Sequence, residues 1–377
     1  PPSRLALDPT DEVILDTGTR THRLRLTEVN DAAERTVHAE ATDPSIYEPL
    51  TGPSRTPSNA TAPSQPGRAL IAFLDLPLLT GRETPWSPHV AAFASPWPGA
   101  ELIYRSAADA NYTLDTTLTA PATMGITTTD FAAGPLWRWD NANAFTLRMF
   151  NGTLTSLDDL SVLAGANALA IENEDGDWEI MQFANAELTA PNEWRLTRLL
   201  RGQAGTESAM RSPVNAGARV VVLDGALEQL HLTEAERTLP FNVRYGPTDR
   251  ALSDPAFQSA ALQFQGIALR PYAPTHLRSS WSGGDLILTW TRRDRSPASD
   301  SWDQSEIPLS ETDESYDVEI LNGTDVIRTF ASITAPTVTY TSTMIAEDFP
   351  SGVPTPLTFR VYQLSTPFGR GGPASIT

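Results

Sequence analysis

Residues 167–207 have the sequence NALAIENEDGDWEIMQFANAELTAPNEWRLTRLLRGQAGTE. Its runs NALAIEN and DWEIMQFANAEL are separated by acidic residues and a glycine, which is the pattern of two strands joined by a turn. The run EWRLTRLLRGQAGTES follows, and the chain then continues through NAGARVVVLDG at residues 215–225. Short apolar runs divided by turn residues predict β-strands throughout this region.

Similar short strands are expected on both sides of this stretch. Residues 11–41 contain the runs VILD, HRLRLTEV and RTVHAEAT, which predict two or three antiparallel strands. The next block opens with ALIAFLDLPLL, an apolar run suited to a strand that is buried on both faces. A single short helix is expected at residues 155–163, where TSLDDLSVL has an N-cap residue and helical spacing.

Composition shifts divide the chain into five parts. Residues 1–50 are expected to form a sheet remnant, and residues 51–68, rich in Pro, Ser, Thr and Gly, predict a linker. Residues 69–150 predict a β-sandwich or barrel, residues 151–270 a β domain with the LLRGQAGTE motif, and residues 271–377 a final sandwich. The predicted fold class is therefore mainly β, in a multidomain chain of sandwich and barrel units.

Charge and composition exclude several classes of function. A net charge of −19 argues against specific nucleic-acid binding and against anionic membranes, because both need basic surfaces. The chain has no cysteine, which removes disulfides and thiolate metal sites. No apolar run approaches the ~20 residues of a transmembrane helix, so no transmembrane segment is expected. The first residues, PPSRLALDPTDE, contain no signal peptide and no initiating Met, and a piece of a longer chain is expected.

The candidate catalytic and metal-binding residues have simpler structural interpretations. Asp158 and Asp159 are adjacent, so on a helix they point about 100° apart and cannot easily face one substrate. The better interpretation is that they lie at the start of a helix, where the helix dipole favours negative charge. An acidic cluster surrounds Gly176 but lacks the ligand spacing of a calcium loop, which favours a hairpin turn. The cluster consists of Glu172, Glu174, Asp175 and Asp177. The histidines show no metal-ligand spacing, so no metal site is expected. No G-x-S-x-G nucleophile elbow and no nucleotide-binding glycine turn after a strand is found in the sequence, so no catalytic or cofactor-binding residue is expected either.

The segment LLRGQAGTE is the one motif dense enough to suggest phosphate binding. It lacks the lysine and the spacing of a P-loop, and two glycines three residues apart more often permit a tight connection with positive φ. Arg201 and Glu207 could pair across that connection. The residues assigned a structural role are Arg201, Gly202, Gly205, Thr206, Glu207 and, in the final domain, Trp290.

A small basic knot of Arg292, Arg293 and Arg295 follows the apolar strand LILTW. The favoured interpretation is that these arginines pair with the acidic insert SDSWDQSEIPLSETDES, which comes next in the chain. Binding of an anionic sugar or of lipopolysaccharide phosphate is the alternative.

The segment from residue 163 to residue 223 resembles a known family. It contains the patterns GAN, WEIMQF, RLTRLLRGQAGTE and GARVVVL. Together these resemble the C-terminal β region of the large baseplate protein, or megatron, of gene transfer agents and of related phage tail-tip proteins.

The final domain resembles fibronectin type III. PTHL leads into Trp290 at the end of strand B, YDVEI fits strand C, and FRVYQLSTPFGRGGPAS fits strand F, its turn and strand G. The arginine-rich insertion between strands B and C again resembles the tail-tip family. Leu357 occupies the place of the tyrosine corner, which departs from the fibronectin pattern.

The resemblance implies a structural, non-enzymatic component of a phage-like tail tip. Residues 1–50 would be the remnant of a hub-type domain. The chain is expected at the distal end of the tail of a virion or gene-transfer-agent particle, and outside the cell after release. There it would contribute to host-surface contact and DNA delivery. The expected partners are further copies in a homotrimer, other hub and baseplate proteins and a bacterial surface glycan.

Two other functions are compatible with the residues. A carbohydrate-binding module for capsule or lipopolysaccharide would use exposed aromatic platforms, for which the candidates are Trp86, Trp97, Trp137 and Trp139. A glycan hydrolase would need two carboxylates facing a groove, roughly 5 to 10 Å apart. The first predicts clustered exposed indoles, whereas a scaffold predicts that most of them are buried.

Overall fold

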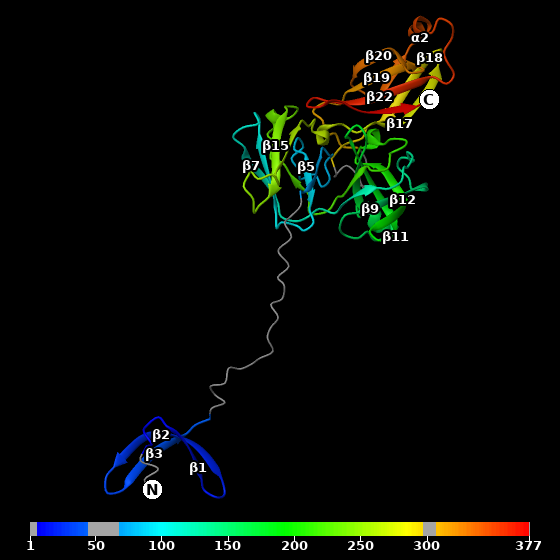
Figure 1. Cartoon of the computed structure of the whole chain (residues 1–377). Coiled ribbons are helices and arrows are strands. Elements are labelled where there is room, and N and C mark those ends of the chain that lie inside the picture. The colour runs from blue at the N-terminus through cyan, green and yellow to red at the C-terminus, as the bar shows by residue number, and fades with distance from the viewer. Residues whose placement is uncertain (1–5, 44–67, 297–306, 377) are drawn as a thin grey trace. The chain divides into compact units, whose positions relative to one another are not determined.

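The computed structural model describes residues 6–43, 68–296 and 307–376 (Figure 1). The chain divides into two compact units, Pro1–Ser64 and Gln65–Thr377. Strands contain 47% of the described residues and helices 6%, which confirms the prediction of a mainly β, multidomain chain. Among the described residues, no helix is both long and apolar enough to cross a membrane.

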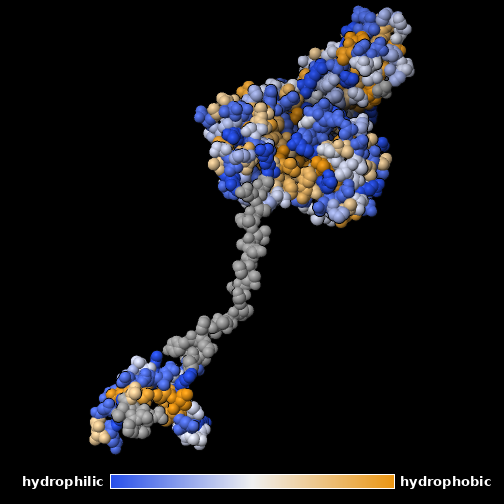
Figure 2. Space-filling model, viewed as in Figure 1, coloured by the Kyte–Doolittle hydropathy of each residue, from blue (hydrophilic) through white to orange (hydrophobic). Residues whose placement is uncertain are grey.

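The first unit contains one antiparallel sheet of three strands. Strands β1 (Glu12–Asp16), β2 (Thr21–Asp31) and β3 (Arg35–Ala41) pair in the order β1-β2-β3. The register pairs Val13 with Leu24 and Leu26 with Ala39, so apolar residues gather on one face (Figure 2). The predicted linker at residues 51–68 lies outside the described residues, except for Arg68.

The second unit begins with two sheets that share a core. One has the order β14-β5-β4, with β4 (Leu70–Leu74), β5 (His89–Phe93) and β14 (Glu228–Gln229). The other has the order β16-β15-β6-β7, formed by β6 (Glu101–Ser106), β7 (Thr113–Leu118), β15 (Phe241–Pro247) and β16 (Gln258–Leu262). Val90 from one sheet and Ile103 and Val243 from the other are fully buried in one cluster, so the sheets form a sandwich.

A closed barrel follows, with the strand order β10-β11-β12-β9-β8-β13. Its strands are β8 (Met124–Thr127), β9 (Asp140–Met149), β10 (Ala168–Glu172), β11 (Trp178–Ala190), β12 (Glu193–Gln203) and β13 (Arg219–Val222). Strands β10 and β11 form the predicted antiparallel hairpin. Helix α1 (Asp159–Leu163) lies within the predicted helical range, and the carboxylate of its N-cap Asp158 accepts a hydrogen bond from Ser161 N at 2.9 Å. Asp158 therefore begins a helix, as expected.

Strand pairing in the second unit differs from the expected division at residue 150. Strands β8 and β9 precede that residue, yet they pair with β13 and β12 beyond it. Strands β14 and β15 come after the barrel in the chain but pair with β5 and β6 of the sandwich. Sandwich and barrel are thus interleaved in sequence. A hydrophobic pattern locates strands but does not state their partners, because pairing depends on contacts between distant residues.

The last part of the chain has two further sheets around one core. Strands β17 (Thr275–Ser282), β18 (Asp285–Thr291) and β21 (Thr337–Tyr340) have the order β17-β18-β21. The second sheet has the order β20-β19-β22-β23, with β19 (Tyr316–Asn322), β20 (Asp325–Ile333), β22 (Thr358–Ser365) and β23 (Gly369–Ile376). Helix α2 (Ser342–Asp348) follows β21. The fibronectin type III assignment stays a prediction.

A buried carboxyl group lies in the sandwich. Glu101 on β6 is 0% exposed, and within the described chain neither of its carboxylate oxygens has a hydrogen-bond partner. Burial, with a smaller contribution from the charge of Asp249, raises the pKa of Glu101 to about 7. The folded sandwich therefore binds a proton more tightly than the unfolded chain does. The contribution of Glu101 to stability is therefore fully present below its ordinary pKa of 4.5 and is lost as pH rises toward 7.

We expect the substitution Glu101→Gln to remove this pH dependence. The variant should match the unchanged protein near pH 4.5 and should be more stable at pH 8, because no charge is then buried. Each pKa unit corresponds to about 1.4 kcal/mol, so the gain should be a few kcal/mol. Hydrogen exchange of strands β6 and β15 at several pH values measures it. Glu228→Gln, at an exposed position of the same sandwich, serves as the control, and an identical pH profile for all three proteins would contradict the prediction.

Candidate functional site

A fully buried ion pair anchors the LLRGQAGTE motif inside the barrel. Arg201 on β12 donates to Glu179 on β11 through Nε at 2.7 Å and Nη2 at 2.8 Å. The two side chains are 0% and 2% exposed. Arg201 also donates to the carbonyl of Ala132 at 2.8 Å, and the backbone N–H of Gly202 donates to Glu179 at 3.1 Å. The pair is therefore satisfied by further hydrogen bonds, as a buried pair requires.

The expected pairing of Arg201 with Glu207 is wrong. Antiparallel pairing of β11 with β12 sets Ile180 opposite Gln203, and this register brings Glu179 beside Arg201. Glu207 begins the 3₁₀ helix η3 (Glu207–Ala209) beyond the turn and forms an ion pair with Arg293 instead.

The two motif glycines have the predicted positive φ angles, +57° at Gly202 and +78° at Gly205. A Cβ atom at Gly205 would lie 2.2 Å from Cδ1 of Tyr272, so this position also needs the absence of a side chain. Thr206, which follows Gly205 and precedes the 3₁₀ helix η3, is buried. Its hydroxyl donates to the carbonyl of Gln203 at 2.7 Å and accepts from Ile180 N at 2.9 Å. The turn is thereby tied back to strand β11.

The motif contacts the final domain at a joint formed by Gly205, Glu207, Arg270, Tyr272 and Arg293. Arg270 donates to the carbonyl of Gly205 at 3.3 Å. The guanidinium of Arg293 pairs with Glu207 and lies 5.0 Å from the centre of the Tyr272 ring. Burial raises the pKa of Tyr272 to about 12, so its hydroxyl is neutral at physiological pH. The joint combines one ion pair with ring packing and a close backbone approach.

The basic knot divides between two partners. Arg292 donates to Glu314 at 3.1 Å and Arg295 donates to Glu311 at 2.8 Å, which confirms the predicted pairing with the acidic insert for these two residues. Arg293 is the exception, because it turns to Glu207 of the barrel. Residues 297–306 of the insert lie outside the described residues.

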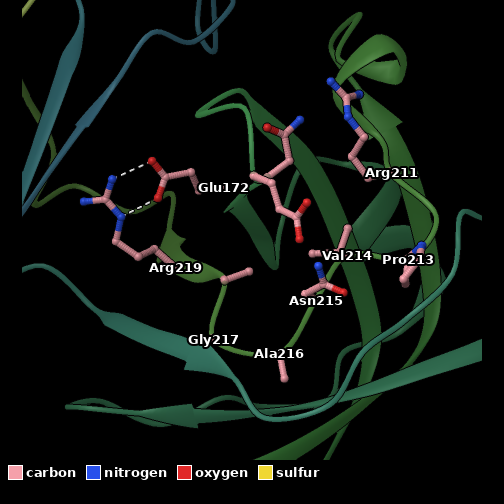
Figure 3. Close-up of a pocket in the computed structure, with 11 residues that line it drawn as sticks. Glu172, Arg211, Pro213, Val214, Asn215, Ala216, Gly217 and Arg219 are labelled. Atoms are coloured by element: carbon pink, nitrogen blue, oxygen red, sulfur yellow. Dashed lines mark hydrogen bonds and ion pairs between the residues drawn. The ribbon is translucent and has the colours of Figure 1, made fainter.

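A cavity of about 390 Å³ opens beside the β10–β11 hairpin (Figure 3). It lies between the hairpin turn and residues 211–219, and Glu172 and Arg219 form an ion pair at its side. The Asn173 side chain accepts hydrogen bonds from the backbone N–H groups of Asp175 and Asp177, at 2.9 and 3.0 Å. Arg211 is paired with Asp175 at 2.6 Å. The acidic cluster thus belongs to the β10–β11 hairpin, as predicted, and Glu172, Asp175 and Asp177 form ion pairs with nearby arginines.

The four candidate indoles do not form one exposed cluster. Trp86 is partly buried and donates to the carbonyl of Leu232 at 2.9 Å, and Trp97 packs against the same sandwich core. Trp139 is partly buried beneath the guanidinium of Arg198, which lies 4.7 Å from the ring centre. Trp137 alone among the four is largely exposed, at 60%. Trp290 is buried in the final domain, and its ring centre lies 5.1 Å from that of Tyr316 in an edge-to-face contact.

Two residues that determine the site were missed by sequence reasoning. Glu179 is a charged residue within the apolar run DWEIMQF, and a charge in a buried strand signals a partner. The sequence around Tyr272 gives no indication of its role. Its contact is with Gly205, which lies far away in the chain.

The fold and these contacts define a mainly β, multidomain protein whose motif residues make internal contacts. Residues 122–221 match the family described as Rcc01698-like, C-terminal, which is associated with gene transfer agents. This match covers nearly the whole barrel, from β8 to β13. The sequence has no significant match among curated proteins.

Solved structures include distant similarities. A β-1,2-glucanase from Parabacteroides distasonis matches with 10% sequence identity and a TM-score of 0.18. The match covers 82% of this chain, and the chain spans 36% of the length of the glucanase chain. A similarity of this size carries no functional argument.

We expect the substitution Arg201→Met to destabilise the barrel by about 3 to 5 kcal/mol, because it leaves the charge of Glu179 buried without a partner. The double variant Arg201→Met with Glu179→Met should lose much less than the sum of the two single changes. Hydrogen exchange of β11 and β12 measures both. Asp175→Asn, which removes an exposed ion pair, should cost about 1 kcal/mol or less. Additive losses in the double variant would show that the two residues are not coupled.

A second prediction separates backbone strain from packing at the joint. Gly205→Ala and Gly217→Ala both place a side chain at positive φ, which costs roughly 1–2 kcal/mol. Only Gly205→Ala also forces a Cβ against Tyr272, since nothing lies within 4 Å of the Cβ position at Gly217. Hydrogen exchange around residues 270–293 should therefore rise in Gly205→Ala and stay unchanged in Gly217→Ala. Equal exchange in both variants would contradict a packing role for Gly205.

Proposed function

We propose that this chain is a structural component of the tail tip of a gene-transfer-agent-like particle. The observation that carries the proposal is the joint, where the barrel that matches the Rcc01698-like family is fastened to the final domain through the family-like motif. The motif residues Arg201 and Thr206 are each about 99% buried, with 1% exposure, and are used in internal contacts. This is the arrangement of a scaffold that holds domains in a defined orientation.

The proposed mechanism is conformational and includes no covalent step. Contact with a host surface would shift domains relative to one another, and the joint would transmit that shift from the final domain to the barrel. The two sequence segments that resemble tail-tip proteins, the LLRGQAGTE motif and the arginine-rich insertion, supply the two sides of the joint, Glu207 and Arg293. The net charge of −19 would reduce adhesion to DNA that passes nearby, because like charges repel.

The proposed assembly is a homotrimer at the distal end of the tail, together with other hub and baseplate proteins. The fibronectin type III-like character of the final domain is part of the proposal. It is supported by the two sheets of three and four strands that enclose a shared core containing Trp290 and Tyr316. Domains of this architecture are common in extracellular proteins.

Electron microscopy of particles tests the proposed function. Particles from producing cells would carry an affinity tag at the C-terminus of the chain, labelled with gold or resolved directly in a density map. We expect label at the distal tail end and density for the barrel and the final domain around a threefold axis. A chain that is absent from purified particles, and is recovered only free in solution, would contradict the proposal.

A further inference from the structure

Trp137 has an unusual conformation for a large side chain. It lies in the connection between β8 and β9, beside the bridge from Leu136 to Arg201, and its φ angle is +55°. Non-glycine residues rarely adopt this conformation, which costs on the order of 1 to 3 kcal/mol and persists where the surroundings enforce it. The indole is nevertheless 60% exposed. A strained backbone position thus carries a large aromatic ring that is exposed to solvent.

Residues of the joint hold this ring in position on one of its faces. The guanidinium of Arg293 lies over the indole, 5.6 Å from the ring centre, and Glu207 and Tyr272 hold Arg293 in turn. One face of the indole is thus occupied by a fixed cation, and the exposed part of the ring remains free to contact a ligand. Trp281 on β17 is equally exposed, at 59%, but no arginine is found over its ring in the described part of the chain. A held aromatic ring loses little entropy when it binds a ligand.

Arg138, the next residue, adds a charge to this platform. It is exposed, and no ion pair or hydrogen bond of its side chain is found within residues 6–43, 68–296 and 307–376. Most other arginines of the second unit form such contacts, as Arg198, Arg211 and Arg219 illustrate. A guanidinium offers a planar pair of donors that match a carboxylate. Adjacent residues therefore supply a stacking surface and a carboxylate-binding group.

We propose that Trp137 and Arg138 form a binding site for an acidic saccharide. The C–H groups on one face of a pyranose ring would lie on the exposed part of the indole, and a ring carboxylate would accept hydrogen bonds from Arg138. A nucleic acid could also stack on the indole, but following its phosphate backbone requires a groove of several basic residues. Of the two arginines at this platform, Arg293 is paired with Glu207, which leaves Arg138 to bind one acidic group. The inference goes beyond the proposed particle role and does not depend on it.

Calorimetric titration of the full chain with an oligomer of galacturonic acid tests the site, with a malto-oligosaccharide of equal length as the neutral probe. We expect the acidic oligomer to bind more tightly than the neutral one. Trp137→Ala should weaken both by at least tenfold, and Trp281→Ala, the matched exposed indole, should change neither. Arg138→Gln should reduce binding of the acidic oligomer to the level of the neutral one.

Three outcomes would overturn the inference. These are an unchanged protein that binds neither saccharide, a Trp137→Ala variant that binds as the unchanged protein does, and tighter binding of oligo-deoxythymidine than of the acidic oligomer. Trp137→Phe guards against a variant whose joint is disturbed, because it keeps a ring over Arg293 and should retain part of the binding. The titration uses the free chain, so a negative result counts against the saccharide site alone. The proposed tail-tip role is tested separately, by whether the chain is present in particles.

Discussion

The buried ion pair between Arg201 and Glu179 is the constraint on which the central part of the molecule depends. Two charges at 0% and 2% exposure are tolerated in an apolar core only when their hydrogen-bonding groups are satisfied. That requirement determines the neighbouring structure. The loop after β8 passes close enough for the Ala132 carbonyl to accept from Arg201, and the backbone at Gly202 turns so that its N–H reaches Glu179. The sharp turn after β12 follows from these contacts.

The turn after β12 then determines where the joint lies. Because φ is positive at Gly202, near the end of β12, and again at Gly205 just after it, η3 begins next to the final domain, and Glu207 meets Arg293 there. A motif that is compact in sequence therefore has two separate tasks. Its first half closes the core of the barrel, and its second half contacts another domain. Neither task resembles the phosphate binding that glycine-rich segments often perform.

Sandwich and barrel cannot be separated at one point in the chain. The segment that crosses from β7 to β8 enters the barrel, and the segment after β13 returns to the sandwich through β14. Two crossing segments make independent unfolding of the parts less favourable than a single linker would. This agrees with the proposed scaffold role. The final domain begins after η5 (Ile267–Leu269) and contacts the barrel through the side chains of the joint.

Four features of the structure could be predicted from the residues alone: the strand-rich fold class, the hairpin at residues 168–190, the short helix after Asp158 and the positive φ angles of the motif glycines. These are local properties, set by hydrophobic alternation, capping and the conformational freedom of glycine. Tertiary structure decided which strands pair across residue 150, that Arg201 binds Glu179 rather than Glu207, and that Trp137 among four candidate indoles is exposed. Partner choice depends on distances between residues far apart in the chain. No local pattern encodes these distances, because they result from how all the strands pack together.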